Sequence, residues 1–269
     1  MSKRNSQTAK TAARERLRAE RERQAKRDKV RRQFVVGGAV VGVLALGAGI
    51  AVAVVKMNAP SYWEKAADQK LVQPANSTGK NGTSIEIGDA SAKHTLKVYE
   101  DLRCPVCAQF EQTSGEEVQK DAKDGKYKIS YTMGAFLDDA LKQGQGSKNA
   151  LSALGAALNV SKDAFVQYHA LLYSKDVHPE ETKDDFGSDA KLIEIAQKVD
   201  ALKGNKTFED AVRNGTYDKW ALTMAKQFDT DGITGTPTVK LDGKTIENVQ
   251  TMTPQQFTAA VDAQIGAKQ

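Results

Sequence analysis

The stretch His94-Thr-Leu-Lys-Val-Tyr-Glu-Asp-Leu-Arg-Cys-Pro-Val-Cys107 decides the fold, because it joins a strand pattern to a closely spaced pair of cysteines. Apolar residues alternate with polar ones through residues 94–101, which predicts a strand. A helical pattern follows over residues 108–123, and a second strand pattern covers residues 127–133. The sequence therefore predicts a β-α-β unit with both cysteines at the start of its helix.

Beyond this unit, the periodicity is helical throughout residues 138–228. Strand patterns return at 237–241 and 244–249, and the dipeptide Asp242-Gly243 between them indicates a hairpin. A last helix is predicted from Pro254 onwards. The predicted order over residues 90–269 is thus β-α-β, a helical block, then β-β-α. The helices expected in the block cover residues 147–158, 161–173, 189–200, 206–213 and 217–228.

The motif Cys104-Pro105-Val106-Cys107 holds the only two cysteines of the chain. A helix N-terminus stabilises a thiolate, so Cys104 is the predicted nucleophile or leaving group, and Cys107 the residue that resolves a mixed disulfide. A purely structural disulfide around so small a loop would contribute only about 2 kcal/mol. A zinc site would need two further ligands, and the three histidines are not clustered in the sequence. We therefore expect redox chemistry, with no metal and no organic cofactor.

The segment Gly232-Ile-Thr-Gly-Thr-Pro-Thr238 precedes the predicted hairpin. Taken alone, Pro237 could be an ordinary turn residue that opens a strand. Together with a CxxC motif at the end of a β-α-β unit, it is similar to the cis-proline loop beside the disulfide of thioredoxin folds.

Over residues 90–269 these features together resemble the DsbA-like thiol:disulfide oxidoreductases, particularly the membrane-tethered ones of Gram-positive bacteria and actinobacteria. The resemblance implies an α/β thioredoxin fold with a helical insertion over about 138–228. It implies that Cys104 is the attacking or leaving cysteine in disulfide exchange and that Cys107 is the cysteine that resolves the mixed disulfide. It also implies that Pro237 is the cis-proline. Thr236 would pair through its backbone with an extended substrate segment, and its side chain would approach Cys104.

The sequence departs from the family pattern at two positions. Val106 stands where the family often has histidine or an aromatic residue. The neutral valine side chain cannot stabilise the Cys104 thiolate electrostatically from this position. Val98 stands six residues before the first cysteine, where many thioredoxin folds keep a buried acid. Glu100 and Asp101 are the acids near this position, and one of them could accept a proton from Cys107. The favoured interpretation is that both are solvated residues at the end of the strand.

The N-terminal part of the chain predicts a membrane anchor. Residues 34–55 carry no charge, and 22 residues at about 1.5 Å each can cross a bilayer core of about 30 Å. The basic residues 1–33 precede this segment, which places the N-terminus in the cytoplasm and the remainder outside the cell. A cleaved signal and a buried core helix are the alternatives. Residues 56–89 have mostly the composition of a linker.

Charge is concentrated at the N-terminal end of the chain. Residues 1–33 hold 13 Lys/Arg and 4 acids, so the other residues carry a net charge of −4 although the whole chain is at +5. This distribution argues against a nucleic-acid-binding domain. The tail is predicted to be a charged helix that orients the protein and associates with anionic lipid headgroups, with a cytoplasmic nucleic-acid role as the alternative.

The predicted protein is thus an anchored extracytoplasmic oxidoreductase that donates the Cys104–Cys107 disulfide to reduced exported proteins. The resemblance further implies a quinone-linked membrane reoxidant of the VKOR or DsbB type. The alternatives are a disulfide reductase or isomerase that uses the same CxxC, and a tethered binding or chaperone-like module. Direction depends on reduction potential, which spans about 150 mV between a reductant such as thioredoxin and a strong oxidant.

Overall fold

The computed structural model describes residues 2–57, 60–141 and 144–266, without the side chains of residues 2–9, 36, 39–49 and 51–57. The chain divides into two compact units, Met1–Ser61 and Tyr62–Gln269.

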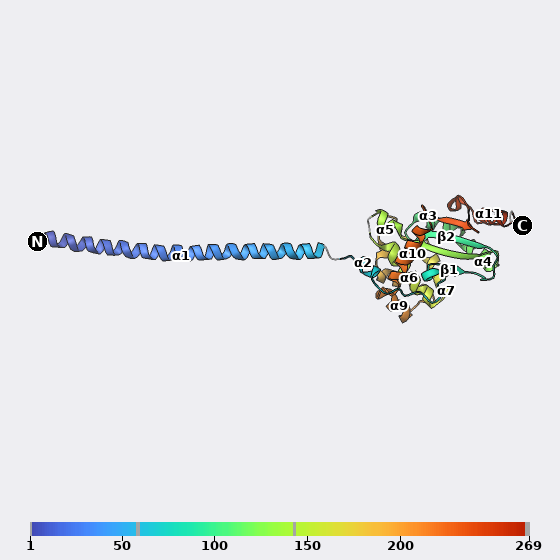
Figure 1. Cartoon of the computed structure of the whole chain (residues 1–269), viewed down its shortest axis with the longest axis horizontal. Helices are drawn as coiled ribbons and strands as arrows, with labels where there is room; N and C mark the ends of the chain where they lie inside the picture. Colours follow the sequence, from blue (N-terminus) through green and yellow to red (C-terminus); the bar gives the residue numbers. More distant parts are fainter. Residues whose placement is uncertain (1, 58–59, 142–143, 267–269) are drawn as a thin grey trace. The chain divides into compact units, whose positions relative to one another are not determined.

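The first unit consists of α1 (Ser2–Met57), a single continuous helix (Figure 1). Its charged part is helical as predicted, with Arg18 and Glu22 paired across one turn at 3.6 Å. Among the described residues, no helix combines the length and the apolar character needed to cross a membrane. The predicted anchor at residues 34–55 falls mostly on side chains outside the described part, so it stays a prediction.

The second unit is built on a five-stranded sheet with the order β1-β3-β2-β4-β5. The central strands β2 (Thr95–Asp101) and β3 (Lys128–Gly134) are parallel, and all other neighbours are antiparallel. This is the β-α-β unit that the sequence predicts. The other strands are β1 (Ile85–Ile87), β4 (Thr238–Leu241) and β5 (Lys244–Thr245).

The predicted hairpin forms, but its second strand is short. Asp242 and Gly243 both have positive φ, at 50° and 86°, as the turn of a two-residue hairpin requires. Strand β5 ends at Thr245, four residues earlier than expected, and η4 (Val249–Thr251) follows the left-handed residue Asn248. The segment after β5 therefore leaves the sheet edge and lines a groove beside the CxxC motif.

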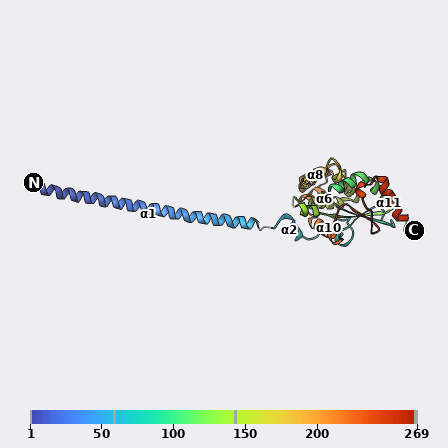
Figure 2. The same cartoon turned by 90° about the horizontal axis from the view of Figure 1, so that it is seen from above.

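The sheet is covered on both faces by helices (Figure 2). On one face lie the CxxC helix and the last helix, α11 (Pro254–Gly266), whose rings Phe110 and Phe257 are 6.0 Å apart. The CxxC helix is not continuous as predicted. It consists of α3 (Pro105–Phe110), a π-helical turn η2 (Glu111–Gly115) and α4 (Glu116–Lys123). On the other face α10 (Asp218–Thr230) places Phe228 against Tyr99.

The helical insertion forms the rest of the domain. Three helices begin at side-chain caps, where Ser161, Ser188 and Asn205 accept hydrogen bonds from backbone N–H groups. The helix boundaries agree with the sequence pattern to within four residues, and α5 was not predicted. The remaining elements of the insertion are α5 (Phe136–Leu141), α6 (Gly146–Val160), α7 (Lys162–Tyr173), η3 (Asp185–Gly187), α8 (Asp189–Ala196) and α9 (Lys206–Arg213).

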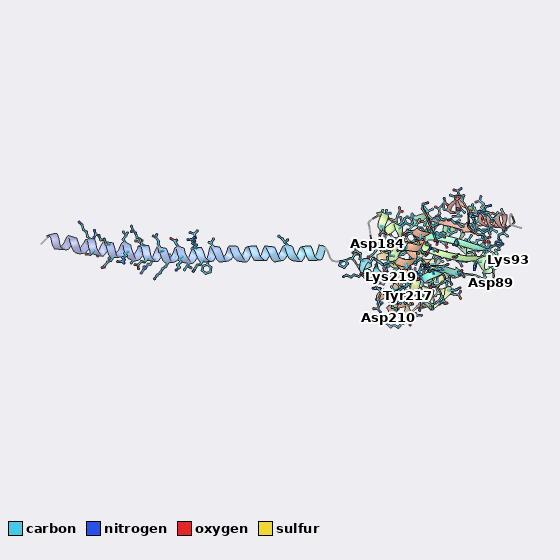
Figure 3. The ribbon with its side chains drawn as sticks, viewed as in Figure 1. Asp89, Lys93, Asp184, Asp210, Tyr217 and Lys219 are labelled. Atoms are coloured by element: carbon cyan, nitrogen blue, oxygen red, sulfur yellow. The ribbon has the colours of Figure 1, made fainter. Side chains whose placement is uncertain are left out.

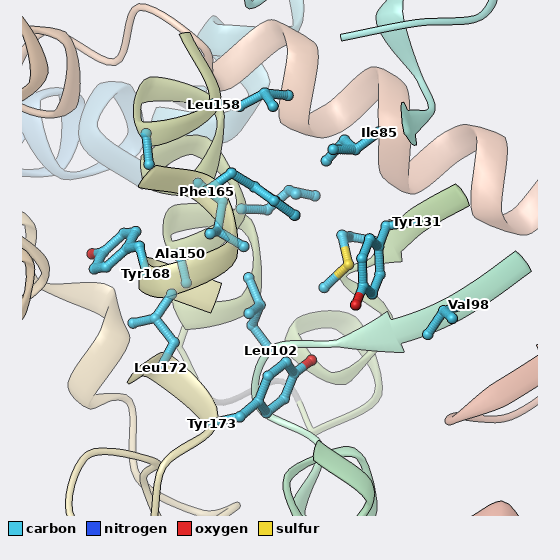
Figure 4. Packing of buried hydrophobic residues seen from close by; sticks show 14 of the residues in the cluster. Ile85, Val98, Leu102, Tyr131, Ala150, Leu158, Phe165, Tyr168, Leu172 and Tyr173 are labelled. Atoms are coloured by element: carbon cyan, nitrogen blue, oxygen red, sulfur yellow. The ribbon is translucent and has the colours of Figure 1, made fainter. Parts of the chain in front are cut away.

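One hydrophobic core joins the sheet to the insertion, and Figure 4 shows part of it. Val98, Leu102 and Tyr131 enter this core from the sheet and its ends, and Leu172 and Tyr173 enter it from α7. All five side chains are essentially inaccessible to solvent. The end of β2 is therefore covered by α7, which decides the surroundings of the cysteines.

Residues 62–89, which the sequence analysis assigned to a linker, belong to this domain. Helix α2 (Tyr62–Ala67) is held to α10 by a 2.5 Å hydrogen bond from Tyr62 to Asp218. The Trp220 indole donates a 2.7 Å hydrogen bond to the backbone carbonyl of Gly82. Strand β1 pairs with β3, with Ile85 and Ile87 buried. Because these contacts are made with distant segments, the local composition of residues 62–89 did not show them.

Candidate active site

The two cysteines lie where β2 turns into α3. Cys104 has extended backbone angles and caps α3, with Pro105 at the first helical position. Its N–H donates to the carbonyl of Asp101 at 2.9 Å, and its carbonyl accepts from Ala108 N–H at 3.0 Å. Both cysteines are free thiols; Cys104 is 7% exposed and Cys107 is fully buried. The first cysteine is thus the one that a substrate can reach.

The surroundings shift the pKa values of the two thiols in opposite directions. A hydrogen bond from the Cys107 thiol, with others from Thr236 and from the backbone N–H groups of Cys107 and Val106, lowers the pKa of Cys104 to about 6 despite burial. Burial raises the pKa of Cys107 well above its usual value, and the hydrogen bond to Cys104 and the charge of Glu100 act in the same direction. Cys104 is therefore a thiolate at neutral pH, and Cys107 is a thiol.

The loop before β4 lies against the cysteines. The peptide bond Thr236–Pro237 is cis, and the Cys104 Sγ lies 3.7 Å from the Thr236 carbonyl oxygen. Val106, 37% exposed, borders an open groove of about 320 Å³ beside this loop. The other groove residues are 234–239 from the cis-proline loop and 245–250 from the segment after β5. The groove is thus lined by the CxxC residue Val106, the cis-proline loop and the segment after β5.

Glu100 and Asp101 are buried, so the interpretation of both as solvated residues is wrong. The reason is tertiary, because the helical insertion covers the strand end. Asp101 is engaged structurally: its carboxylate accepts hydrogen bonds from the Ser147 hydroxyl at 2.6 Å and from the N–H groups of Arg103 and Leu137. Burial nevertheless raises the pKa of Asp101 to about 6.

Glu100 faces the other side of β2, toward the face that carries Cys107. Its Oε2 lies 3.0 Å from Nε2 of His169 on α7, and burial raises its pKa to about 8. Glu111, one helical turn after Cys107, joins this buried cluster, and burial followed by the charge of Glu100 raises its pKa to about 8. A cavity of about 620 Å³ borders Glu111 and His169 and opens to solvent. Of the two predicted acids, Glu100 is thus the one in the resolving cysteine's environment.

Sequence reasoning missed Glu111, His169 and Arg103 at this site. The spacing of four residues between Cys107 and Glu111 on a predicted helix was an available signal, because such residues share a helix face. Gly115 leaves space for the Glu111 carboxylate, since a Cβ there would lie 2.4 Å from Glu111 Oε2. No local signal pointed to His169, which reaches the site only through the packing of α7.

Glu100, Glu111 and His169 are also the described residues that could hold a metal ion, with ligand atoms within 4.8 Å of one another. Metal ligands must be deprotonated, whereas burial keeps both carboxyl groups largely protonated at neutral pH. We assign no metal to them, and the expectation that the enzyme needs no cofactor stays a prediction.

A thioredoxin family model matches residues 80–263. The chain belongs to the thioredoxin family. Within this family, the domain is similar to a disulfide bond oxidoreductase (DsbG) of Mycobacterium tuberculosis, with a TM-score of 0.58 and 29% identity over 69% of this chain and 88% of that one. It is also similar to DsbA of the same organism, with a TM-score of 0.56 and 27% identity over 68% of this chain and 93% of that one.

Two sequence relatives each match about three fifths of this chain. Disulfide bond formation protein D of Bacillus subtilis is 25% identical over 60% of this chain and 69% of its own length. The chain spans 30% of the length of another relative, the serine/threonine-protein kinase PknE of Mycobacterium tuberculosis, at 24% identity over 62% of this chain. The domain around residues 80–263 is thus of the DsbA-like thiol-disulfide oxidoreductase type.

Proposed function

We propose that this protein is an extracytoplasmic thiol:disulfide oxidoreductase that donates the Cys104–Cys107 disulfide to reduced cysteine pairs in exported proteins. The observation that carries the proposal is the asymmetry of the two thiols. Cys104 has a low pKa and lies 3.7 Å from the carbonyl oxygen of Thr236, which lines the groove, while Cys107 is buried with a raised pKa. A low thiol pKa makes a good leaving group, which favours release of an oxidised substrate.

The reaction proceeds in two exchanges. A substrate thiolate attacks Cys104 Sγ of the disulfide, a mixed disulfide forms, and Cys107 leaves. A second substrate thiolate then attacks the substrate sulfur of the mixed disulfide, and Cys104 leaves as a thiolate. The substrate loses two electrons and forms its disulfide, and the enzyme is left as the dithiol.

Glu100 serves the departing Cys107 in this proposal. The sulfur of Cys107 needs a proton when its bond to Cys104 breaks, because burial disfavours its thiolate. With a pKa near 8, the Glu100 carboxyl is protonated at neutral pH and can supply this proton. In the reverse direction, when Cys107 attacks a mixed disulfide, Glu100 accepts the proton. Asp101 takes no part, because it is held by Ser147, Arg103 and Leu137.

The remaining parts of the proposal concern location and turnover. The apolar segment 34–55 would anchor the protein, with the basic tail in the cytoplasm and the thioredoxin domain outside. The dithiol must be reoxidised after each cycle. A membrane partner of the VKOR or DsbB type, which passes the two electrons to quinone, would do this.

The reduction potential of the full chain in detergent, equilibrated with glutathione buffers at pH 7, tests the direction of the reaction. A value above about −180 mV is expected for a disulfide donor. A value below about −230 mV would instead identify a reductase. Cys104→Ser should abolish oxidation of a reduced dithiol peptide, whereas a binding or chaperone-like module would keep its affinity for unfolded chains. Ser84→Ala, remote from the cysteines in sequence and bonded to Ser130, serves as the control variant.

A further inference from the structure

Arg103 directly precedes the reactive cysteine, and its side chain is fully buried. Its Nη1 donates a 3.0 Å hydrogen bond to Oδ1 of Asp138, which is itself 1% exposed. Its Nη2 donates to the backbone carbonyl of Glu181 at 3.0 Å. A guanidinium supplies several donors in a rigid plane, so one side chain here connects the turn before Cys104 with two separate parts of the helical insertion.

The partners of Arg103 are themselves fixed at the start of α6. Asp138 accepts hydrogen bonds from the N–H groups of Ser147 and Lys148, each at 2.9 Å. Asp184, labelled in Figure 3, has a side chain that is 34% exposed and lies 3.8 Å from Arg103. It accepts hydrogen bonds from the N–H groups of Gln145 and Gly146. Both carboxylates therefore occupy the positive end of α6, and the Arg103 cation offsets their charge.

The same segment of the insertion makes a second contact with this turn. The pKa of His178 is lowered by burial and raised by the backbone of Leu102, one residue before Arg103, so the His178 side chain lies beside this part of the turn. The His178 ring stacks on Tyr173 at 5.7 Å and meets Phe186 edge-on at 6.3 Å. Residues 178–184, called the strap here, thus hold both residues that precede Cys104.

Cys104 depends on the geometry of this turn. Its low pKa arises from the Cys107 thiol, from Thr236 in the cis-proline loop, and from the N–H groups of Val106 and Cys107 at the start of α3. On the strand side, the charge of Cys104 contributes to the raised pKa of Glu100 on β2. A small rotation of the turn would lengthen several of these hydrogen bonds together.

We propose that Arg103 is a positioning residue that, with His178, ties the Cys104 turn to the strap and so keeps Cys104 reactive. The helical insertion then does more than cover the sheet, because it sets the reactivity of the nucleophile. The inference rests on the thiol chemistry of the CxxC motif in the proposed function, and it holds for either direction of the reaction.

The test compares Arg103→Lys with His178→Phe in the reduced full chain. Lysine keeps a charge opposite Asp138 but cannot donate to Asp138 and Glu181 in the same planar geometry. Phenylalanine keeps the ring stacking and removes the polar imidazole nitrogens that lie beside the Leu102 backbone. Each variant should react about threefold more slowly with iodoacetamide at pH 6, which is the factor expected when the thiolate loses one ordinary hydrogen bond. The reduction potential of the Cys104–Cys107 pair should also be lower in each variant than in the wild-type protein.

Arg213→Lys is the matched control, because the same substitution there affects only an exposed pair with Glu209 at 3.7 Å. A merely structural role of Arg103 would lower the unfolding midpoint and leave the alkylation rate and the potential unchanged. A folded Arg103→Lys protein with the wild-type alkylation rate and the wild-type reduction potential would overturn the proposal. If Arg103→Lys does not fold, His178→Phe decides by the same two measurements. A wild-type protein whose Cys104 is not alkylated faster than a free thiol would instead refute the proposed function.

Discussion

The strongest determinant of the Cys104 thiolate is the buried thiol of Cys107, and substitutions of Cys107 isolate its contribution. The Cys107 hydrogen bond is the largest cause of the lowered Cys104 pKa. A hydrogen bond to a charged group contributes about 1.5–3 kcal/mol, or roughly one to two pKa units. Cys107→Ala should therefore raise the Cys104 pKa from about 6 to roughly 7–8. Cys107→Ser keeps a donor at the same place and should leave the pKa near 6.

The thiolate absorbance at 240 nm, followed against pH, measures both values in proteins with a single cysteine. At pH 6 about half of Cys104 is ionised in the serine variant, so the alanine variant should be alkylated about 5- to 50-fold more slowly. An alanine variant that titrates near pH 6 would refute the reasoning. The N–H groups of α3 and the cis-proline loop would then be enough to keep the Cys104 pKa low without Cys107.

The same pKa sets a pH dependence for the reduction potential. Because the Cys104 pKa is lowered, thiolate stabilisation of the reduced form is present above about pH 6 and is lost as the pH falls through that value. At pH 7, which is one unit above the Cys104 pKa, this thiolate stabilisation is about 1.4 kcal/mol. For a two-electron couple it raises the reduction potential by about 30 mV. This is a fifth of the span between thioredoxin and a strong oxidant, so other contributions must supply the rest of an oxidising potential.

Three further outcomes are expected. Glu100→Gln should slow the attack of Cys107 on a mixed disulfide at Cys104 at least about tenfold in stopped-flow measurements, and unchanged rates relative to the partly exposed control Glu117→Gln would exclude the proton-transfer role. In urea titrations of the oxidised protein, the free energy of unfolding should decrease between about pH 7 and pH 8, by at most about 1.4 kcal/mol per pH unit and carboxyl. Below about pH 6.5 the lowered pKa values of His169 and His178 act in the opposite direction. The raised pKa values of Glu100 and Glu111 keep protons on the native state that the unfolded chain has lost, and an increase between about pH 7 and pH 8 would contradict this assignment. Gly134→Ala should lower stability by about 1–3 kcal/mol, because the added Cβ would lie 3.1 Å from the Phe228 ring, and an unchanged thermal midpoint would show that the ring can move away.

The sequence alone determined the spacing of the two reactive cysteines and the place of the CxxC motif in the fold. Cys104 and Cys107 are two residues apart at a strand-to-helix junction, and the pattern of the flanking residues identifies that junction without any long-range contact. Pro237 and the Asp242-Gly243 turn are equally local, since proline and glycine restrict the backbone wherever they occur. The helices of the insertion followed from periodicity for the same reason.

Only the tertiary structure decided what surrounds the cysteines. Strand β1 has three residues, too few for a periodic pattern, and it becomes a strand through pairing with β3. Glu100 is an acid at the end of a strand by sequence, and it acquires a raised pKa because α7 covers it. Arg103 and Glu111 are charged residues of a kind that usually faces solvent. The burial of Arg103 and the partial burial of Glu111 depend on the packing of distant segments, and local sequence patterns carry no information about such packing.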